Sequence, residues 1–330
     1  MKKILILVLV LVLGAVFLLY GGYSSAIHYA LNPSSANRVT VTVPEGATGS
    51  EVADLLYEKG LIKSPTAFNF YLRQNDLSNE LKAGRFVFRE SDDMARIVEI
   101  LASGKSSEVV LTLLEGWTTR QIAEKLEIEE LTTAEDFMKC LEECEFDFNF
   151  IPEGYLEGYL YPDTYFVNPD QYSDEALINR LLNTFKNKLS DEDWEAINAS
   201  PRSFEDIMIM ASIVEREERD PAERPTVAGI LWNRFDADIG LGADATVLYG
   251  LGRTSGGLSY EDLQSDSPYN TRKYAGLPPT PICNPSITSI HAALYPEDTD
   301  YWYYLHDSDG VIHYAKTLDE HNVNKARYIH

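Results

Sequence analysis

The hydrophobic pattern of the chain begins with an uncharged apolar run from Ile4 to Tyr23, directly after Lys2 and Lys3. A run of about 20 apolar residues is long enough to cross a bilayer as a helix, and the two lysines favour a cytoplasmic N-terminus. A cleaved signal peptide ending near Ser24-Ser25-Ala26 is the alternative, but the run is longer than the ~7–15 residues usual for such signals. We therefore predict a retained single-pass anchor in the cell membrane over residues 1–23, with the rest of the chain outside the cytoplasm.

Alternation of apolar and polar residues starts behind a small, polar segment at residues 24–37, which we interpret as a tether. Residues 38–43 (RVTVTV) alternate strictly, which is the pattern of a half-buried strand. We assign residues 38–108 to a small α/β module. Its other predicted elements are a helix in the stretch 50–62 that Gly60 terminates, a helix at 67–73, a strand at 84–88, and a helix that Ser91 caps and Gly104 ends.

One strand-turn-helix pattern occurs twice, with a constant offset of 70 residues (115 − 45). Each copy has an apolar pair, a Glu-Gly turn, a threonine two positions later and the same apolar helix face. Chance similarity between two such units is the alternative, and two copies are too few for a solenoid. The equivalent positions are Val41, Val43, Glu45, Gly46, Thr48, Ala53 and Leu56 in the first copy, and Leu111, Leu113, Glu115, Gly116, Thr118, Ala123 and Leu126 in the second.

Residues 109–330 show a mixed pattern, and we assign them to a larger second domain. Between about 130 and 200, helical stretches alternate with an aromatic segment at 156–165. Residues 203–235 predict two helices, and the chain after them contains short strands and many turns. No regular β-α-β alternation is present, so we predict a mixed α+β fold.

The net charge of the chain restricts the partners that we expect. The 330 residues carry a formal net charge of −24, and a nucleic-acid partner is excluded because phosphate binding needs clustered Lys and Arg. We interpret the acidity as a solvated surface rather than a specific cation site. The six histidines have no metal-ligand spacing, and no P-loop, GxSxG or HExxH motif is present, so we expect neither a metal nor a cofactor.

The three cysteines are Cys140, Cys144 and Cys283. Cys140 and Cys144 stand four apart in a helical pattern, a spacing that we interpret as two neighbouring side chains rather than a disulfide. No CxxC pair exists to support zinc binding or redox chemistry. We therefore expect three buried structural thiols.

A predicted helix that starts at Phe204 contains the strongest candidate for chemistry. Ser203 is its expected N-cap, and the stretch from Ile207 to Val214 is apolar nearly all round, which is typical of a buried helix. Glu215 is the first charged residue as this helix emerges. A carboxyl group held against apolar side chains is protonated more readily than one in water, which is what a general acid requires. The alternative is a solvated charged end on a buried helix.

An isolated carboxyl group in an aromatic-rich chain indicates glycoside chemistry, because aromatic faces bind sugar rings. Most glycosidases use two carboxylates, either ~5 Å or ~6.5–9.5 Å apart. Glu157 and Asp244 are the candidates for a second carboxylate. An enzyme with a single carboxyl group is the alternative, if the substrate supplies its own nucleophile.

A series of motifs resembles the YceG-like endolytic murein transglycosylases. The stretch MASIVERE at 210–217 resembles the catalytic helix of that family. With the N-terminal apolar run, the resemblance covers nearly the whole chain. The other motifs, in the family's order, are EGYLYPDTY at 157–165, Asn233-Arg234, DATVLYG at 244–250, SPYNT at 267–271, GLPP at 276–279, Asn284-Pro285 and Glu320-His321-Asn322.

The resemblance implies a LysM-like module at 38–108, a catalytic domain at 109–330, and cleavage of the MurNAc–GlcNAc β-1,4 bond without water. It marks Glu215 as the acid that protonates the leaving oxygen and then as the base that helps the MurNAc 6-hydroxyl close a 1,6-anhydro ring. It further implies that the enzyme cuts nascent glycan strands and limits their length, with peptidoglycan synthases and elongation or division proteins as partners. Substrate contacts are expected from Glu157, Asp244, Tyr269, Asn270 and Thr271.

The chain departs from the family pattern at three places. Residues 242–246 read GADAT where a Gln-Ser/Thr-Asp-Pro-Thr run is usual, Arg272 replaces an aromatic residue, and Thr280 replaces a glycine. These changes leave the sugar contacts of residues 242–246 open. Two rival functions remain: a hydrolytic muramidase on the same scaffold, and a non-catalytic peptidoglycan-binding or assembly protein.

Overall fold

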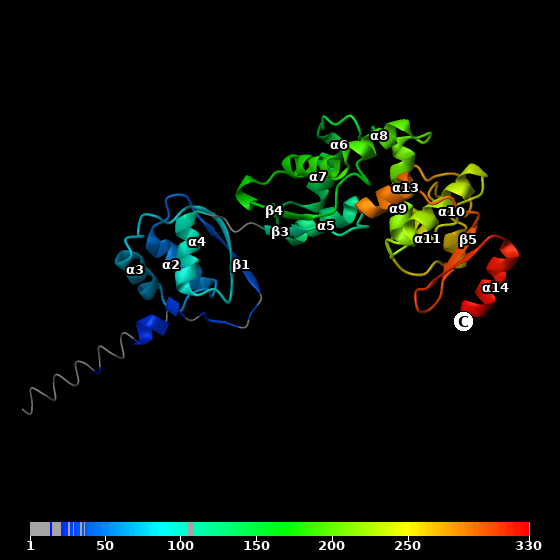
Figure 1. Cartoon of the computed structure of the whole chain (residues 1–330). Coiled ribbons are helices and arrows are strands. Elements are labelled where there is room, and N and C mark those ends of the chain that lie inside the picture. Colours follow the sequence, from blue (N-terminus) through cyan, green and yellow to red (C-terminus); the bar gives the residue numbers. More distant parts are fainter. Residues whose placement is uncertain are drawn as a thin grey trace, which may run out of the picture. The chain divides into compact units, whose positions relative to one another are not determined.

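The computed structural model describes Gly14, residues 21–25, 27–28, 30–33, 35, 37–104 and 109–329 (Figure 1). The chain divides into two compact units: the first contains the described residues up to Val110 together with Phe166–Tyr172, and the second contains Leu111–Tyr165 and the residues from Ser173 onward. The predicted anchor at residues 1–23 lies almost wholly outside the described residues. Within the described part of the chain, no helix is both long enough and apolar enough to cross a membrane.

The first unit is built on a two-stranded antiparallel sheet, in which residues 38–43 pair with residues 84–89. The strict alternation of the first strand puts Val41 and Val43 on the buried face, where Phe86 of the second strand also lies. The predicted strand at 38–43 is therefore confirmed. The elements of this unit are β1 (Arg38–Val43), α2 (Gly49–Glu58), α3 (Pro65–Gln74), β2 (Gly84–Arg89) and α4 (Met94–Ser103).

Helix α4 begins later than its sequence pattern indicated. The prediction that Ser91 caps it is wrong, because the side chain of Asp93 accepts the hydrogen bond from the Arg96 N–H, at 2.8 Å. Asp93 stands directly before the first helical residue, so its carboxylate reaches a backbone N–H that the helix itself leaves free. Gly104 ends the helix in the left-handed region, with a φ of 63°, as predicted.

The repeated strand-turn-helix pattern is confirmed as a repeated local structure. In each copy a glycine with positive φ follows a strand: Gly46 at 79° and Gly116 at 76°. In each copy a threonine then caps a ten-residue helix through a capping box, Thr48 for α2 and Thr118 for α5. The second copy consists of β3 (Val109–Thr112) and α5 (Thr119–Ile128).

The second unit is mainly helical, with short strands. The described residues form three two-stranded sheets, β1–β2, β3–β4 and β5–β6, so the predicted mixed α+β class is confirmed. After α5, the elements of the chain are α6 (Ala134–Glu143), β4 (Thr164–Val167), the 3₁₀ helix η1 (Pro169–Gln171), α7 (Asp174–Lys188), α8 (Asp191–Ala199), α9 (Phe204–Glu217), α10 (Arg224–Asp236), α11 (Asp244–Gly250), α12 (Tyr260–Leu263), α13 (Ile287–Leu294), β5 (Tyr303–His306), β6 (Ile312–Ala315) and α14 (Leu318–Tyr328).

An aromatic cluster joins the start of α9 to helices α7 and α8. The Phe185 ring of α7 lies 6.3 Å from the Phe204 ring of α9, and Trp194 of α8 lies 5.4 Å from Phe204. Phe150 and Tyr159 complete the cluster from the segment between α6 and β4. Helix α9 continues from this cluster and packs against α10, α11 and α13 (Figure 1). Its packing partners therefore include α13, a helix from a distant part of the sequence.

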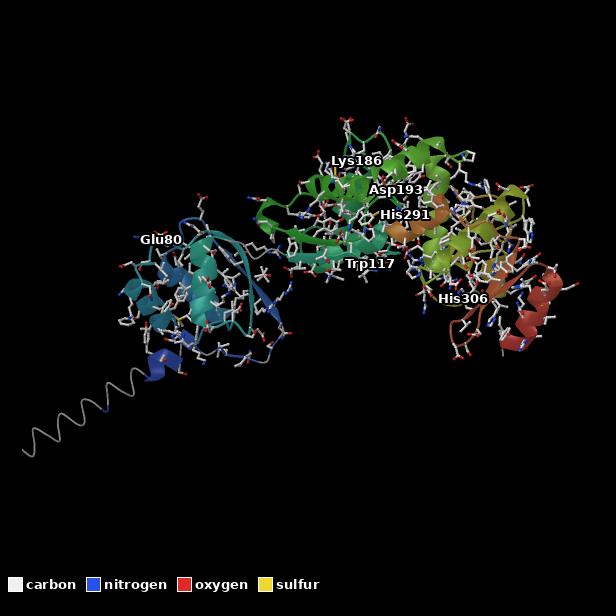
Figure 2. All side chains as sticks on the ribbon, viewed as in Figure 1. Glu80, Trp117, Lys186, Asp193, His291 and His306 are labelled. Atoms are coloured by element: carbon white, nitrogen blue, oxygen red, sulfur yellow. A yellow bond between two sulfur atoms is a disulfide. The ribbon has the colours of Figure 1, made fainter. Side chains whose placement is uncertain are left out.

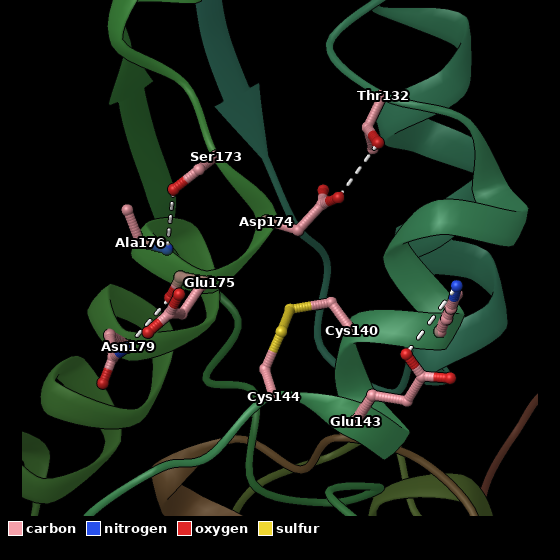
Figure 3. Close-up of a disulfide and its surroundings, with 10 residues drawn as sticks. Thr132, Cys140, Glu143, Cys144, Ser173, Asp174, Glu175, Ala176 and Asn179 are labelled. Carbon is pink, nitrogen blue, oxygen red and sulfur yellow. Dashed lines mark hydrogen bonds and ion pairs between the residues drawn. A yellow bond between two sulfur atoms is a disulfide. The ribbon is translucent and has the colours of Figure 1, made fainter.

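Two of the three cysteines contradict the prediction of free thiols. Cys140 and Cys144 form a disulfide, with their Cα atoms 4.9 Å apart (Figure 3). The prediction treated both residues as helical, but α6 ends at Glu143 and Cys144 has an extended backbone, with φ −77° and ψ 147°. Cβ atoms four residues apart on a helix lie about 5–6 Å apart, beyond the ~3.5–4.5 Å of a disulfide, and the extended backbone of Cys144 removes that restriction. Cys283 is a buried free thiol, as predicted.

Candidate active site

The helix that presents Glu215 forms as its sequence predicted. The Ser203 side chain accepts a hydrogen bond from the Asp206 N–H at 3.0 Å and caps α9. All residues from Ile207 to Val214 are buried, because an all-round apolar helix is stable only inside a protein. The side chain of Glu215 is only 6% exposed, so the alternative of a solvated charged end is wrong for this residue.

Four hydrogen bonds surround the carboxyl group of Glu215. Arg224 donates to it through both terminal guanidinium nitrogens, at 3.1 and 3.2 Å. Ser286 donates its backbone N–H at 2.9 Å and its hydroxyl at 2.6 Å. Ser286 is also the N-cap of α13, so the carboxyl group lies at the positive end of that helix dipole. These contacts fix both the position and the orientation of Glu215.

Arg224 is a functional candidate that the sequence reasoning missed. Its side chain is 6% exposed, and besides Glu215 it donates to the hydroxyls of Ser286 at 2.7 Å and Thr288 at 2.6 Å, and to the Glu218 carbonyl at 3.0 Å. A buried ion pair is stable only when further hydrogen bonds satisfy both partners, and this pair meets that condition. One sequence signal existed: Arg224 is the first residue of α10, where a cation opposes the helix dipole unless a specific anion compensates for it.

The turn after β3 brings Glu115 to the same site. A Cβ atom on Gly116 would stand 3.7 Å from Cγ of Glu215, so this turn lies against the catalytic candidate. Arg216 holds the turn by donating to the Gly116 carbonyl at 3.4 Å and, through its other terminal nitrogen, to the Thr254 carbonyl. Burial and the nearby charge of Glu215 raise the pKa of Glu115, and Arg224 opposes that rise. Sequence reasoning noted Glu115 only as part of a repeated turn.

Glu157, expected to bind substrate, instead makes a dense set of bonds within the protein. Its carboxyl group accepts from the Thr119 N–H at 3.0 and 3.2 Å and from the Thr119 hydroxyl at 2.9 Å. Tyr249 donates its hydroxyl at 3.2 Å and Asn284 its amide at 3.3 Å. Burial raises the pKa of Glu157 to about 7, although the hydrogen bonds from Thr119 and Tyr249 oppose that rise. The geometry joins three segments of the chain through one carboxyl group.

Asn284 connects Glu157 to the Glu215 site. Its side-chain oxygen accepts from the N–H groups of Gly158 at 3.1 Å and Leu160 at 2.9 Å. Its backbone carbonyl accepts from the Gly116 N–H at 2.9 Å. Ser286, two residues later, donates to Glu215. The segment 284–286 therefore fixes the EGYLYPDTY motif, the Glu115-Gly116 turn and the carboxyl group of Glu215 relative to one another.

Two of the expected substrate residues are buried and use their side chains internally. Asn270 donates its side-chain amide to the carbonyls of Leu263 at 3.0 Å and Ser265 at 2.9 Å. The Thr271 hydroxyl lies 2.8 Å from the Thr246 hydroxyl and accepts from the N–H of the residue before Asp244 at 3.2 Å. Asn270 therefore holds the segment that follows α12, and Thr271 holds the loop that precedes α11.

The other two expected residues are more accessible. Tyr269 is half-buried; its ring lies 4.9 Å from the Tyr249 ring, and its hydroxyl lies 2.8 Å from the Thr280 hydroxyl. Tyr249 therefore joins Tyr269 to Glu157. Asp244, the first residue of α11, is exposed and forms an ion pair with Arg272 at 2.6 Å. Arg272 and Thr280 are two of the positions at which the chain departs from the family pattern, and here each is the partner of an expected substrate residue.

The C-terminal hairpin binds the acidic end of α9. The Tyr304 hydroxyl donates to Glu217 at 2.9 Å, and Nε2 of His306 lies 2.8 Å from Oε2 of Glu218 (His306 is labelled in Figure 2). Burial raises the pKa of Glu217, and the bond from Tyr304 opposes that rise. Glu217 and Glu218 are thus bound by β5, while Glu215 is bound by α10 and α13.

The arrangement provides one carboxyl group fixed by an arginine and a helix N-terminus, with a second carboxyl group, Glu115, beside it. Such a group can donate and accept a proton at one place, which is the requirement for general acid–base catalysis.

Comparison with known proteins places the chain in a family. Residues 41–327 match the model of the YceG-like family. A protein of Bacillus subtilis (strain 168) named endolytic murein transglycosylase is 32% identical, over 97% of this chain and 91% of its own length. A Streptococcus pneumoniae (strain D39) protein of the same name is 28% identical over 94% of this chain, which spans 62% of that relative. The crystal structure of a yceG-like protein (lmo1499) of Listeria monocytogenes, 32% identical, covers 88% of this chain and 99% of its own with a TM-score of 0.60. The chain belongs to the YceG-like family.

Proposed function

We propose that this member of the YceG-like family is an endolytic peptidoglycan lytic transglycosylase. It cleaves the MurNAc–GlcNAc β-1,4 bond inside glycan strands and leaves 1,6-anhydro-MurNAc ends. The observation that carries the proposal is the buried, four-times hydrogen-bonded carboxyl group of Glu215 at the end of α9. The Bacillus subtilis relative, of which this chain spans 91%, is named for that activity.

In the proposed reaction Glu215 acts twice. It first gives a proton to the GlcNAc oxygen as the bond from that oxygen to C1 of MurNAc breaks. The MurNAc 6-hydroxyl oxygen then bonds to C1, and its proton returns to Glu215, so no water is consumed and the enzyme ends unchanged. Arg224 and Ser286 hold the carboxyl group in place for both proton transfers.

Among the expected substrate residues, the geometry supports two different roles. Tyr269 and Asp244 are accessible, and we propose that they contact the glycan. Glu157, Asn270 and Thr271 are buried and bonded to other segments, which supports a role in holding the loops that surround the substrate.

The proposed location is the outer face of the cell membrane, with the N-terminal apolar run as the anchor. The Cys140–Cys144 disulfide supports this location, because disulfides persist in oxidising compartments. The strand-helix-helix-strand order of β1, α2, α3 and β2 supports a LysM-like, glycan-binding role for the first unit. Nascent strands next to the membrane are then the substrate, and peptidoglycan synthases and elongation or division proteins are the partners.

A hydrolytic muramidase is the second candidate function, because Glu115 provides a second carboxyl group close enough to respond to the charge of Glu215. Mass spectrometry of peptidoglycan digested by the full chain in detergent, beside Glu215→Gln, separates the candidates. Anhydro-MurNAc ends from the wild type alone support the transglycosylase. Reducing MurNAc ends establish the muramidase. No cleavage by folded protein that binds glycan establishes the non-catalytic binding protein.

A further inference from the structure

A cavity of about 580 Å³ lies on the side of α9 that carries Glu217. Its walls come from the end of α9, from α10, from the start of α11, from β5 and from α14. Glu217 stands two residues after Glu215 on α9, so the cavity and the Glu215 carboxyl group lie on different faces of the same helix turn. Helix α14 also carries the Glu320-His321-Asn322 motif, to which the catalytic scheme assigns no role.

His321 presents an unsatisfied buried atom in the wall of this cavity. The residue is 9% exposed and its ring stacks on Tyr303, with centroids 5.2 Å apart. Its Nδ1 atom is buried and has no hydrogen-bond partner among the described residues. An unpaired buried polar atom destabilises the folded state. The described residues supply no partner for this atom, and a ligand group in the cavity is one partner that could.

Two cations in the cavity wall also have donors to spare. Arg234 uses Nε and Nη2 on the Gly240 carbonyl, at 3.1 and 2.6 Å, and among the described residues its Nη1 has no hydrogen-bond partner. Lys325, on α14, forms no ion pair within that part of the chain. Burial, with the charges of Lys325 and Arg234, lowers the pKa of His321. The cavity therefore combines two cations with an imidazole ring whose pKa lies below its usual value.

The acidic groups of the cavity are already engaged. Asp244 pairs with Arg272 at 2.6 Å, and Glu217 accepts from the Tyr304 hydroxyl at 2.9 Å. His306, a further wall residue, lies 2.8 Å from Glu218. In the described part of the chain Arg234 and Lys325 keep unpaired donors, and Nδ1 of His321 can donate in one tautomer, so a carboxylate fits all three groups.

We propose that this cavity binds a carboxylate of the peptide stem on the glycan strand, an inference that rests on the proposed peptidoglycan substrate. The sugars of a peptide-bearing strand are neutral, because the lactyl group of MurNAc is then an amide, and the free carboxylates belong to the stem peptides. Arg234, His321 and Lys325 bind the carboxylate, and the aromatic rings of β5 contact the peptide. The cavity thereby makes cleavage next to Glu215 selective for strands that carry peptides.

The first test measures binding of the tetrapeptide L-Ala–γ-D-Glu–meso-diaminopimelate–D-Ala to the full chain in detergent, by titration calorimetry. Lys325→Glu should weaken binding about tenfold, because attraction becomes repulsion. Arg327→Glu is the matched control: it makes the same charge change on the same helix, outside the cavity wall, and should leave binding unchanged. Equal effects of the two variants, or no binding of the tetrapeptide by the wild type, would overturn the proposal.

His321→Phe is the second variant. Phenylalanine keeps the stacking on Tyr303 and removes the unpaired nitrogen, so the variant should unfold at the same temperature as the wild type or higher. Binding of the tetrapeptide should nevertheless fall severalfold. A variant that binds the tetrapeptide as tightly as the wild type contradicts the role of His321.

Cleavage assays on glycan strands stripped of peptides distinguish binding of the stem-peptide carboxylate from binding of the free lactyl carboxylate. Lys325→Glu should raise the KM for peptide-bearing strands and leave the KM for stripped strands unchanged. The same rise on stripped strands would assign the cavity to the lactyl carboxylate and overturn the stem-peptide proposal. Peptide binding that depends on Lys325 in a protein that makes no anhydro ends would refute the proposed function and leave the cavity assignment standing.

Discussion

The turn between β1 and α2 and the turn between β3 and α5 share one backbone conformation but have different surroundings. Gly46 and Gly116 have φ values of 79° and 76°. Nothing lies within 4 Å of the place where a Cβ on Gly46 would stand, whereas a Cβ on Gly116 would stand 3.6 Å from Arg216 and 3.7 Å from Glu215. The same local code therefore builds an open turn in one unit and one side of a candidate active site in the other.

The first turns of the two helices show the same difference. In α2 the capping box is completed locally, by Glu51, which accepts from the Thr48 N–H at 2.7 Å. In α5 the local partner is Gln121, and the next N–H, that of Thr119, is bound by the remote carboxyl group of Glu157. Hydrogen bonds from Thr48 lower the pKa of the exposed Glu51, while burial raises that of Glu157 to about 7. The N-terminus of α2 is thus capped at the surface by Glu51, whereas the N-terminus of α5 is bound by the buried carboxyl group of Glu157 from another segment.

The largest expected effect concerns Glu215, whose side chain lies beside the Gly116 turn and has no counterpart at the Gly46 turn. Glu215→Gln should lower the rate of strand cleavage by about 10²–10⁴-fold, because one group provides both proton transfers. Glu51→Gln, at the first copy, should leave the rate unchanged. Release of anhydro-MurNAc fragments measures both variants. Comparable losses in the two would show that the difference between the copies is not a catalytic one.

The two carboxylates at the helix ends should respond to pH in opposite directions. The folded pKa of Glu157 is raised from 4.5 to about 7, so its contribution to stability is full below about pH 4.5 and is lost as pH rises through 7. The loss is on the order of 3 kcal/mol. Glu51, whose pKa is lowered, contributes stability that is lost as pH falls below its usual range.

Urea unfolding followed by tryptophan fluorescence tests this contrast for Glu157, because Trp117, Trp194, Trp232 and Trp302 all belong to the second unit. The free energy of unfolding of the wild type minus that of Glu157→Gln should decrease between pH 5 and pH 8. A difference that stays constant over this range contradicts the raised pKa.

The disulfide is a feature of the second helix pair alone. In the first unit α2 packs on α3, and in the second α5 packs on α6. The Cys140–Cys144 disulfide links α6 to the segment that follows it. Reduction should lower the stability of the second unit by about 2 kcal/mol, the loop-closure value for so short a loop. Tryptophan-detected urea unfolding with and without reductant measures this, and Cys140→Ser/Cys144→Ser should not respond to the reductant. Equal sensitivity of that variant would show that another group is being reduced.

The smallest expected effect separates the two turns. Gly46→Ala and Gly116→Ala should each cost about 1–2 kcal/mol of local stability, because alanine is strained at positive φ. Only Gly116→Ala should also slow strand cleavage, by a few fold, since relaxation of that turn displaces Arg216 and Glu215. Hydrogen exchange of the two turns, combined with cleavage assays, measures both quantities. Slower cleavage by Gly46→Ala would remove the distinction.

Features that depend on neighbours along the chain were predictable. The alternation of residues 38–43 predicted β1, the Glu-Gly-x-Thr repeat predicted two equivalent turns, and Ser203 with the apolar run after it predicted α9. Each of these features follows from backbone sterics, local caps or burial of one face. The failures were also local in origin: Ser91 in place of Asp93, and a helix assumed to continue through Cys144.

By itself, the sequence determined the family, the elements and the position of Glu215 as the first charge after a buried helix. Only the tertiary structure decided what surrounds that carboxyl group. Arg224 comes from the next helix, Ser286 from a segment 71 residues away, and Glu115 from a turn that looks like its copy in the first unit. The physical reason is that periodicity and capping act over one or two turns of chain, whereas the partners of a buried charge are chosen by packing among segments whose separation in sequence carries no information about their distance in space.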